Sequence, residues 1–573
     1  MTKLVNEPLD FAAEALAEFA ALNGDRVAPV RGGVVRAQRT PDGQVAIVMG
    51  GGSGHFPAFA GWVGRGFGHG AACGNVFASP SEKEVLTVAR AAASASGGVL
   101  FTPINYAGDI LNFGAAAERL RADGIDTRMV PVTDDIASGS SEDRGSRRGI
   151  AGSLLVIKMT GAVVENGASL DEAERIAVAA NEATRSFGVA FSGCTLPGSD
   201  GPLFEVPAGR MAVGLGIHGE PGVAEVALGT ANEVADVLVD GLFEERPPER
   251  GRRVAVLVNG LGATKYDELH IVSARVRARL AAEGMTPVAP LAGEYVTSLD
   301  MAGVSVSLAY LDDELESLWL SPVDSPALTR GASAAWSPAP LREVGAPGDG
   351  TAVDESGPEI VPGSEASASA ARVVLRFLET AAERLVAEET LLGEMDAVAG
   401  DGDHGAGMVR GAQAATKAAR DAVEHGAGAG TTLRLAGESW SAAAGGTSGA
   451  LWGSGLEAAG DAVGDDVSPG QDEILAGVRA FAESITRRGG AAVGEKTMVD
   501  AIMPFADEFA AGVGGRRLTD AWAAAATAAQ TAAERTADYA SSRGRSKLHG
   551  DRSVGTPDPG AVSFALVVGS VLT

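Results

Sequence analysis

The stretch QVAIVMGGGSGHFPAF at residues 44–59 joins a short, β-branched apolar run to a glycine-rich loop. The same order recurs in GGVLFTPINYAGDILNF at 97–113 and in RRVAVLVNGLGATKYDELHIVSARVRARLAAEG at 252–284, where a helical pattern follows. Strand, loop and helix in repetition are typical of an α/β domain with a largely parallel sheet. The pattern covers about 45–180 and restarts over 253–320, so we predict two α/β subdomains within residues 1–325.

The chain changes character after that half. Residues 326–365 are rich in Pro, Gly, Ser and Ala and show no period, which indicates an inter-domain linker. Residues 366–573 hold alanine-rich runs such as LTDAWAAAATAAQTAAERTADYASS, with apolar residues at helical spacing and few strand-like runs. We expect a separate all-α domain here, packed as a bundle of helices.

The composition is that of a globular enzyme and narrows the range of partners. With 74 acidic and 46 basic residues among 573, the net charge of −28 disfavours binding to nucleic acid or to anionic membranes. Two cysteines, Cys73 and Cys194, provide neither a disulfide framework nor a zinc site. Residues 1–24 lack the features of a signal peptide, and no segment has the length and apolarity of a membrane span. We therefore expect a cytoplasmic protein.

The glycine run after VAIVM is the first candidate binding segment. Gly52, Ser53, Gly54 and His55 follow the predicted strand, where glycines let the backbone approach a small ligand closely. No Gly-Lys-Ser/Thr sequence follows, so this is not a Walker loop. A tight strand-to-helix turn is the alternative explanation of the glycines, and His55 favours a site.

Two further segments of the first half carry polar residues beside glycine. Asp109 ends NYAGD, directly before an apolar helical run, and an N-cap is the alternative to a functional role. His218 lies within GLGIHGEPG, with glycines on both sides. A neutral imidazole nitrogen can attack an electrophilic carbonyl, while a histidine in a surface turn is the alternative.

These segments together resemble a known family. GGGSGH, GNVFASPS, NYAGD and GLGIHGEPG, in this order, are similar to the substrate-binding domain of dihydroxyacetone kinases. The resemblance implies that His218 forms a covalent hemiaminal with the carbonyl of a ketose, and that His55 and Asp109 act as acid and base. It also implies that the substrate hydroxyls are bound by Gly52, Ser53, Gly54, His55 and Asp109. Such a bond would select carbonyl compounds over glycerol and fix the terminal hydroxyl for in-line transfer.

The chain departs from the family pattern beside this turn. The familiar run GHEPAHAG is GHFPAFAG here, so Phe56 and Phe59 stand where the family has Glu and His. His55 is kept, while its surroundings become more apolar. The ketose is therefore open between dihydroxyacetone and a tetrulose such as D-erythrulose.

A cluster of aspartates marks the second half. Asp396, Asp401 and Asp403 lie within eight positions and are interleaved with glycines, so they belong to a loop at a helix end. Clustered carboxylates repel one another unless a cation holds them, and hard oxygen ligands suit Mg²⁺. An acidic loop solvated at the surface is the alternative, and the spacing lacks the final Glu of a calcium-binding loop.

Three small glycine- and hydroxyl-containing loops follow, at 445–450, 494–498 and 558–561. Each could donate backbone amides to phosphates or simply connect helices. With the aspartates they resemble the nucleotide-binding domain of the same kinases, an all-α helical barrel. The resemblance implies that Asp396, Asp401 and Asp403 hold two Mg²⁺ ions. It further implies that ATP is surrounded by Asp401, Gly402, Asp403, His404, Thr447, Ser448, Gly494, Thr497, Met498, Asp558, Pro559 and Gly560. Lys496 and Arg545 are nearby cations to which we assign no role.

We therefore predict an ATP- and Mg²⁺-dependent kinase that phosphorylates a small ketose. Three alternatives remain: a phosphotransfer-system kinase, a cyclase that cleaves FAD in the same pocket, and an inactive regulatory relative. The fusion of both domains on one chain favours ATP as phosphoryl donor, and the presence of His218 and the aspartates disfavours the inactive relative. The resemblance also suggests a homodimer in which one chain's helical domain covers the other chain's ketose site.

Overall fold

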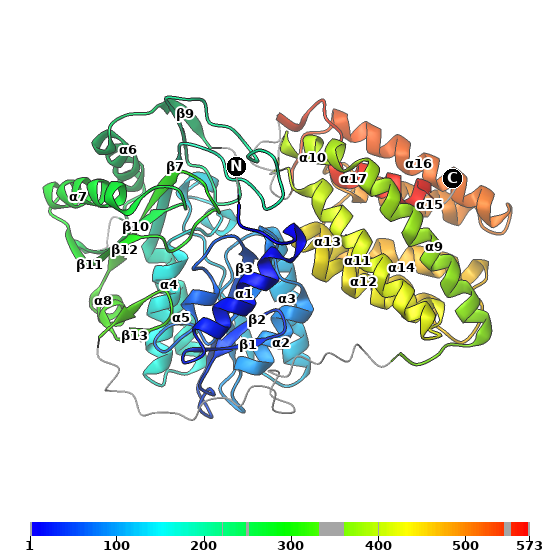
Figure 1. The fold of residues 1–573 in the computed structure, drawn as a ribbon, viewed down its shortest axis with the longest axis horizontal. Coiled ribbons are helices and arrows are strands. Elements are labelled where there is room, and N and C mark those ends of the chain that lie inside the picture. The colour runs from blue at the N-terminus through cyan, green and yellow to red at the C-terminus, as the bar shows by residue number, and fades with distance from the viewer. Residues whose placement is uncertain are drawn as a thin grey trace. The chain divides into compact units, whose positions relative to one another are not determined.

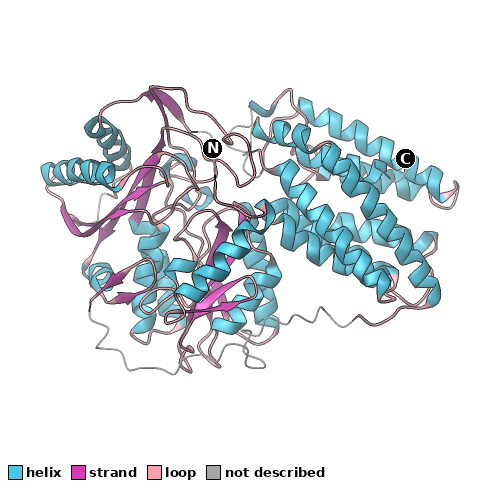
Figure 2. Cartoon of the chain, in the orientation of Figure 1, coloured by secondary structure: helices cyan, strands magenta, loops and turns pink. Residues whose placement is uncertain are grey.

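The structure is a computed structural model that describes residues 3–220, 222–247, 251–331, 360–398, 400, 402–543 and 552–570. The chain divides into two compact units, Met1–Val353 and Asp354–Thr573. Strands and helices alternate in the first unit, whereas the described part of the second is built from helices (Figure 2). The predicted fold class, an α/β half followed by an all-α domain, is confirmed.

The first sheet carries the glycine-rich turn. Its strand order is β1-β2-β4-β3-β5-β6, in which β4, β3, β5 and β6 run parallel and β1 and β2 form an antiparallel edge. Figure 1 labels β1, β2 and β3 of this sheet. The bounds are β1 Val27–Val30, β2 Gly33–Arg36, β3 Ala46–Ser53, β4 Gly70–Val76, β5 Val99–Phe101 and β6 Thr127–Met129. The expectation of a largely parallel sheet is correct for this subdomain.

Helices cover both faces of this sheet, so its central strand is apolar on both sides. Ala46 and Val48 of β3 pack with α2 (Glu82–Ala92) and α3 (Ala107–Ala122). Ile47 and Met49 point to the opposite face and pack with α4 (Ser153–Glu165) and α5 (Leu170–Ala183). Alternate residues of a strand face opposite sides of its sheet, and a strand buried on both sides appears in the sequence as a continuous apolar run.

The second sheet differs from the prediction. Its order is β11-β10-β12-β7-β8-β9, and β10–β11 is the one parallel pair among its described strands. Parallel neighbours need a crossover connection, which α7 (Tyr266–Ala282) provides between β10 and β11, whereas β8 and β9 pair as an antiparallel hairpin. The strands are β7 Thr184–Ala190, β8 Arg210–Val213, β9 Ala224–Ala227, β10 Arg253–Gly260, β11 Thr286–Gly293 and β12 Gly303–Leu311.

Further helices and strands complete the first unit. Together with α7, α6 (Ala231–Glu244) packs on the second sheet through a separate apolar core. The remaining elements are α1 Phe11–Leu22, α8 Asp313–Leu320, β13 Val323–Asp324 and β14 Thr329–Arg330. The β13–β14 pair reaches into the range predicted as linker, 326–365, most of which lies outside the described residues. The predicted linker therefore stays a prediction.

The helices of the second unit close a ring. Contacts run from α9 to α11, then through α12, α13, α14, α15, α16 and α17 in chain order, and α17 returns to α9. The bounds are α9 Glu365–Ala387, α10 Glu389–Ala397, α11 His404–Glu424, α12 Ala429–Ala444, α13 Gly446–Val463, α14 Gln471–Gly489, α15 Val499–Gly512, α16 Leu518–Arg535 and α17 Pro559–Gly569. This is the predicted helical barrel.

Aromatic side chains fill the barrel. Trp440 and Trp452 stack with ring centroids 4.8 Å apart, and Trp452 also lies 5.9 Å from Phe564 of α17. Gly411 is required here, because a methyl group at its position would lie 2.5 Å from the Trp440 indole nitrogen. Stacked rings at these separations contribute beyond their buried area, which explains how alanine-rich helices pack into a stable unit.

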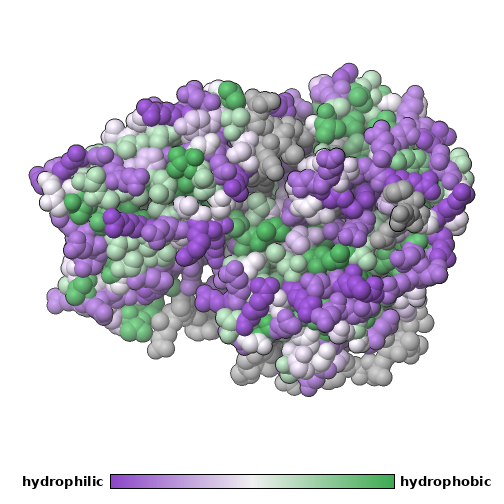
Figure 3. Space-filling view, turned by 180° about the vertical axis from the view of Figure 1, so that it is seen from behind, coloured by the Kyte–Doolittle hydropathy of each residue, from purple (hydrophilic) through white to green (hydrophobic). Residues whose placement is uncertain are grey.

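On the face drawn in Figure 3, hydrophilic and apolar residues are interspersed, as on ordinary globular surfaces. Among the residues that the structure describes, no helix has the length and apolarity needed to cross a bilayer.

Candidate active site

The glycine-rich turn lies at the end of β3. This strand continues through Ser53, so Gly51 and Gly52 belong to the strand rather than to the predicted loop. A methyl group on Gly51 would overlap the ring of Phe59, and one on Gly52 would overlap the backbone of Phe77 and Ala78. Close packing, together with the turn itself, therefore explains why glycines occur here.

The chain turns at Gly54, directly before His55. Gly54 has φ +96°, and a side chain there would lie 2.8 Å from the ring of Phe77. The Ser53 hydroxyl donates to the carbonyl oxygen of Gly74 at 2.6 Å, which ties the turn to β4. The turn thus holds His55 in one place, with Phe77 stacked on its ring at a centroid distance of 4.9 Å.

His55 and His218 meet in the interior of the first unit. Their Nε2 atoms lie 3.0 Å apart, and His55 and His218 are 0% and 3% exposed. The Nδ1 atom of His55 lies 2.8 Å from the carbonyl oxygen of Thr297. The ring of Tyr106 lies edge-on to His218 at 4.5 Å. The structure therefore brings together two predicted histidines that are far apart in the sequence, and the surface-turn alternative for His218 is wrong.

Asp109 is buried in the first turn of α3. This helix begins at Ala107 with Tyr106 as its N-cap residue, so the alternative that Asp109 is the N-cap is wrong. Tyr106 contacts His218, and Asp109 follows three positions later with 4% exposure. On the next turn, Asn112 donates to the hydroxyl of Ser79 at 3.4 Å. The start of α3 is thus a polar, buried element directly connected to the histidine pair.

The two phenylalanines that depart from the family pattern occupy different environments. Phe59 is buried against Gly51 and lies 5.5 Å from the ring of Trp62. Phe56 is 62% exposed and contacts Phe19 of α1 edge-on at 5.8 Å. Phe59 therefore contributes to the core beneath the glycine run, while Phe56 extends an apolar surface beside the turn.

Two aspartates of the predicted cluster, Asp396 and Asp403, lie where α10 ends and α11 begins. The Asp396 carboxylate accepts a hydrogen bond from the Gly402 amide at 2.9 Å, and Asp403 directly precedes the first residue of α11. Asp401 lies outside the described residues, as does Arg545. Asp396 belongs to the last turn of α10 rather than to the predicted loop, whereas Asp403 stands at the start of α11.

His404 connects two of the predicted loops. Its Nε2 atom lies 2.9 Å from the Ser563 hydroxyl on α17, and its Nδ1 atom lies 3.3 Å from the Ser448 hydroxyl. Thr447 and Ser448 stand in the first turn of α13. Burial lowers the pKa of His404, while the Asp396 carboxylate opposes that shift. His404 is therefore a buried connector beside the aspartates.

The two remaining loops approach each other at Met498 and Gly560, and the first of them is held by Asp500, a residue not singled out from the sequence. Its carboxylate accepts from the amides of Gly494 and Thr497 at 2.5 and 2.7 Å. Met498 lies next to Gly560, where an added methyl group would be 3.4 Å from the Met498 Cβ atom. An acidic residue three positions after Thr497 at the start of a predicted helix was the available signal.

A small pocket opens where these loops converge. It is lined by Asp396, Lys496, Asp558 and Pro559, among others. Asp558 is the N-cap of α17 and accepts from the Ala561 amide at 2.7 Å. Burial raises the pKa of Asp558 to about 7, and the Asp396 and Asp500 carboxylates add to that shift. The pocket thus gathers negative charge in a confined space.

This charge distribution suits Mg²⁺. Crowded carboxylates are stabilised by a hard cation, and Mg²⁺ takes oxygen ligands while keeping waters and phosphate oxygens in its shell. Asp396 and Asp403 flank the position of Asp401 on two helix ends, so the described donors fit the predicted ion. Among the described residues, no group of three or more potential ligands is preassembled.

Comparison with known proteins covers both units of the chain. The Dak1 domain family matches residues 17–327 and the DAK2 domain family matches residues 398–573. The chain is 54% identical to L-erythrulose 1-kinase of Mycolicibacterium smegmatis, over 99% of this chain and 98% of that protein. The chain belongs to the dihydroxyacetone kinase family. His55, Asp109 and His218 lie within the Dak1 match, and Asp403 lies within the DAK2 match.

Other members of the dihydroxyacetone kinase family extend the likeness over the whole chain. D-erythrulose kinase of the same organism is 49% identical over 100% of this chain and 98% of that protein. The crystal structure of the dihydroxyacetone kinase from C. freundii in complex with AMP-PNP and Mg²⁺ has a TM-score of 0.52 and 29% identity. It covers 100% of this chain and 99% of that chain.

Proposed function

We propose that the chain transfers the terminal phosphoryl group of ATP to a terminal hydroxyl of a small ketose. Erythrulose is the proposed substrate, because two relatives about half identical to this chain are named for its L and D forms. The observation that carries the proposal is the buried pair of His55 and His218, whose Nε2 atoms lie 3.0 Å apart beside the Gly54 turn. The test below decides which substrate is preferred: L-erythrulose, D-erythrulose or dihydroxyacetone.

The histidine pair suits covalent capture of a carbonyl. In the proposed reaction, the Nε2 atom of His218 bonds to the carbonyl carbon and gives a hemiaminal. Polyols lack that carbon electrophile, so the bond would distinguish a ketose from glycerol. Asp109, buried at the start of α3, would accept the proton of the terminal hydroxyl as it attacks phosphorus.

The pocket of the second unit is the proposed ATP site. Asp396, Asp401 and Asp403 would hold Mg²⁺, which neutralises the phosphates and the charge that develops during transfer. The loops around Ser448, Thr497 and Gly560 would contact the nucleotide, since His404 connects α13 with α17 and Met498 lies beside Gly560. Further proposed nucleotide contacts lie in the same loops: Gly402, Thr447, Gly494, Asp558 and Pro559.

The proposed assembly is a homodimer with exchange of helical domains, located in the cytoplasm. The residues of the proposed ketose site belong to one unit of the chain and those of the proposed nucleotide site to the other. Transfer therefore requires a helical unit, from the same chain or from a second copy, to face the ketose unit. The family resemblance favours the second copy, and mixing of inactive variants tests it.

The function is tested by ATP consumption with a panel of ketoses. We expect kcat/KM to be highest for one hand of erythrulose, lower for dihydroxyacetone, and negligible for glycerol. His218→Ala should remove turnover with every ketose. Turnover that survives in His218→Ala would refute the covalent mechanism. A reaction in which a phosphorylated phosphocarrier protein replaces ATP tests the phosphotransfer-system alternative. A reaction in which FAD replaces both ATP and the ketose tests the cyclase alternative.

A further inference from the structure

We infer that Glu220 is a positioning residue for His218, and that its carboxylate keeps one extra proton on the His55–His218 pair. This inference rests on the proposed function, because it concerns the preparation of His218 for attack on the ketose. Glu220 lies two positions after His218 in GLGIHGEPG. One of its carboxylate oxygens accepts from the His218 backbone amide at 2.9 Å, and the other lies 3.4 Å from the His218 Nδ1 atom.

The hydrogen-bond partners decide where protons can be. A carbonyl oxygen only accepts, so the His55 Nδ1 atom that faces Thr297 carries a hydrogen. The contact between the two Nε2 atoms needs a hydrogen on one of them. The His218 Nδ1 atom makes an ion-pair contact with Glu220 at 3.4 Å, and we place a hydrogen on it because a bare nitrogen lone pair would be repelled by the ionised carboxylate. Three of the four ring nitrogens then carry hydrogen, which is one more than two neutral imidazoles have.

The charges around Glu220 favour an extra proton on the His55–His218 pair. The Arg148 guanidinium lies between two carboxylates, 2.9 Å from Asp135 and 3.6 Å from Glu220. One cation between two anions leaves a net charge of −1 in a buried region, which is costly unless balanced. The extra proton on the imidazole pair balances it. Burial raises the pKa of the Tyr106 phenol, and the Glu220 carboxylate raises it further, so Tyr106 stays neutral and adds no negative charge.

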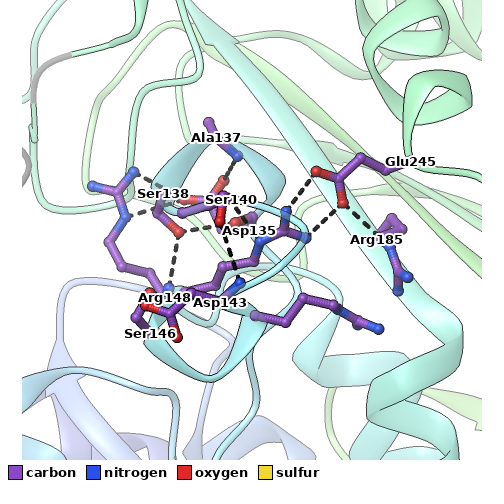
Figure 4. A network of polar contacts seen from close by, with 12 residues as sticks. Asp135, Ala137, Ser138, Ser140, Asp143, Ser146, Arg148, Arg185 and Glu245 are labelled. Atoms are coloured by element: carbon purple, nitrogen blue, oxygen red, sulfur yellow. Dashed lines mark hydrogen bonds and ion pairs between the residues drawn. The ribbon is translucent and has the colours of Figure 1, made fainter.

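Arg148 is itself held in a fixed position, which fixes Glu220 in turn. Its guanidinium reaches Asp135 while its backbone amide donates to the Ser138 hydroxyl at 2.9 Å (Figure 4). The Asp135 carboxylate also accepts from the Ala137 amide at 3.1 Å. Gly216 lets these groups approach, because a side chain there would overlap the Glu220 carboxylate. Glu220 is thus the link between a rigid polar loop and the imidazole of His218.

This arrangement gives a balanced first step. Before attack, His55 is an imidazolium whose Nε2–H donates to the His218 Nε2 lone pair. When a ketose enters, that lone pair bonds to the carbonyl carbon, and the C=O π electrons move to oxygen. The oxygen takes the Nε2 proton of His55, so a hydroxyl forms and His55 becomes neutral. The positive charge moves onto the His218 ring, directly beside Glu220, and no net charge is created.

The test compares the full-length protein with its Glu220→Gln variant, using histidine labelled with ¹⁵N in the ring. The ¹⁵N chemical shifts distinguish nitrogens with and without hydrogen, and His218→Ala assigns the signals. We expect three ring N–H groups on the pair in the wild type at neutral pH and two in Glu220→Gln. We also expect hemiaminal formation with [2-¹³C]dihydroxyacetone to weaken about 10- to 100-fold, the factor for loss of one charge-assisted hydrogen bond.

Two controls keep the outcome clear. Glu165→Gln changes another glutamate, a partly buried one whose carboxylate pairs with Arg36 and Arg65, and it should change neither readout. Glu220→Asp keeps the charge and should retain the extra proton. Two ring N–H groups in the wild type, or three in Glu220→Gln with unchanged adduct formation, would overturn the inference. Three N–H groups in a wild type that forms no adduct with any ketose would instead refute the proposed function.

Discussion

Lys496 gives the sharpest test of how the pocket of the second unit is built. Its Nζ atom donates to the carbonyl oxygens of Tyr539, Ser553 and Thr556 at 3.0, 2.5 and 2.7 Å. An ammonium group has three N–H donors, so the backbone uses all of them. We therefore expect Lys496 to hold the segment before Asp558 in place rather than to bind a phosphate.

The cost of losing this group can be worked from its contacts. Lys496→Met removes the charge and the three hydrogen bonds while keeping an aliphatic side chain of similar length. A hydrogen bond to a charged group contributes roughly 1.5–3 kcal/mol, and desolvation of the ammonium offsets part of that. One contact is buried and two are partly buried. We expect the free energy of unfolding of the helical unit to fall by about 3–5 kcal/mol.

The assay is urea unfolding followed by far-ultraviolet circular dichroism, together with the KM for ATP. Lys496→Met should lower stability and raise the KM for ATP, because the wall that carries Asp558 loosens. Hemiaminal formation in the first unit should not change. The matched control is Lys417→Met on the exposed face of α11, which should behave as wild type. A raised KM for ATP without any loss of stability would refute this reasoning and make Lys496 a phosphate ligand.

Three further predictions address the metal, the assembly and a buried lysine. Asp396→Asn should abolish ATP turnover yet leave the ketose adduct intact, whereas the surface variant Asp461→Asn should change neither turnover nor the adduct. Equal turnover in both variants would contradict the metal assignment. Mixing inactive His218→Ala and Asp396→Asn chains should restore roughly a quarter of wild-type activity if helical domains are exchanged in a dimer, and no recovery would exclude that exchange. Burial lowers the pKa of Lys158 to about 7 from 10.5, and Arg330 adds to this. Between about pH 7 and 10 the folded state then binds fewer protons than the unfolded state, so stability should rise with pH. Lys158→Met should remove that rise in thermal unfolding, and a rise retained in the variant would contradict the assignment.

The sequence predicted the architecture well where local pattern and tertiary structure agree. The apolar run before Gly50 is a strand buried on both faces, and the alanine-rich half is a closed ring of helices. The mainly antiparallel second sheet was missed, because the direction of β12 and β7 depends on pairing between distant segments. A single strand–helix–strand unit at 253–293 looks the same in the sequence whichever sheet surrounds it.

The candidate sites show the same limit at the level of single residues. His55, Asp109 and His218 stand in conspicuous motifs, and the structure pairs the two histidines. Glu220 was quoted within its motif but not singled out, because its role depends on Arg148, which comes from a distant loop. Asp500 was missed for a related reason. Its carboxylate accepts hydrogen bonds from backbone amides, and those amides have no sequence signal of their own.

The central claim is that His218 captures the ketose covalently before phosphoryl transfer. The most direct measurement is ¹³C NMR of [2-¹³C]erythrulose mixed with the full-length protein in the absence of ATP. The account predicts that the carbonyl signal is replaced by a protein-bound sp³ carbon signal in the wild type, and that this signal is absent in His218→Ala. A wild type that phosphorylates the ketose while the bound carbon stays a carbonyl would contradict it.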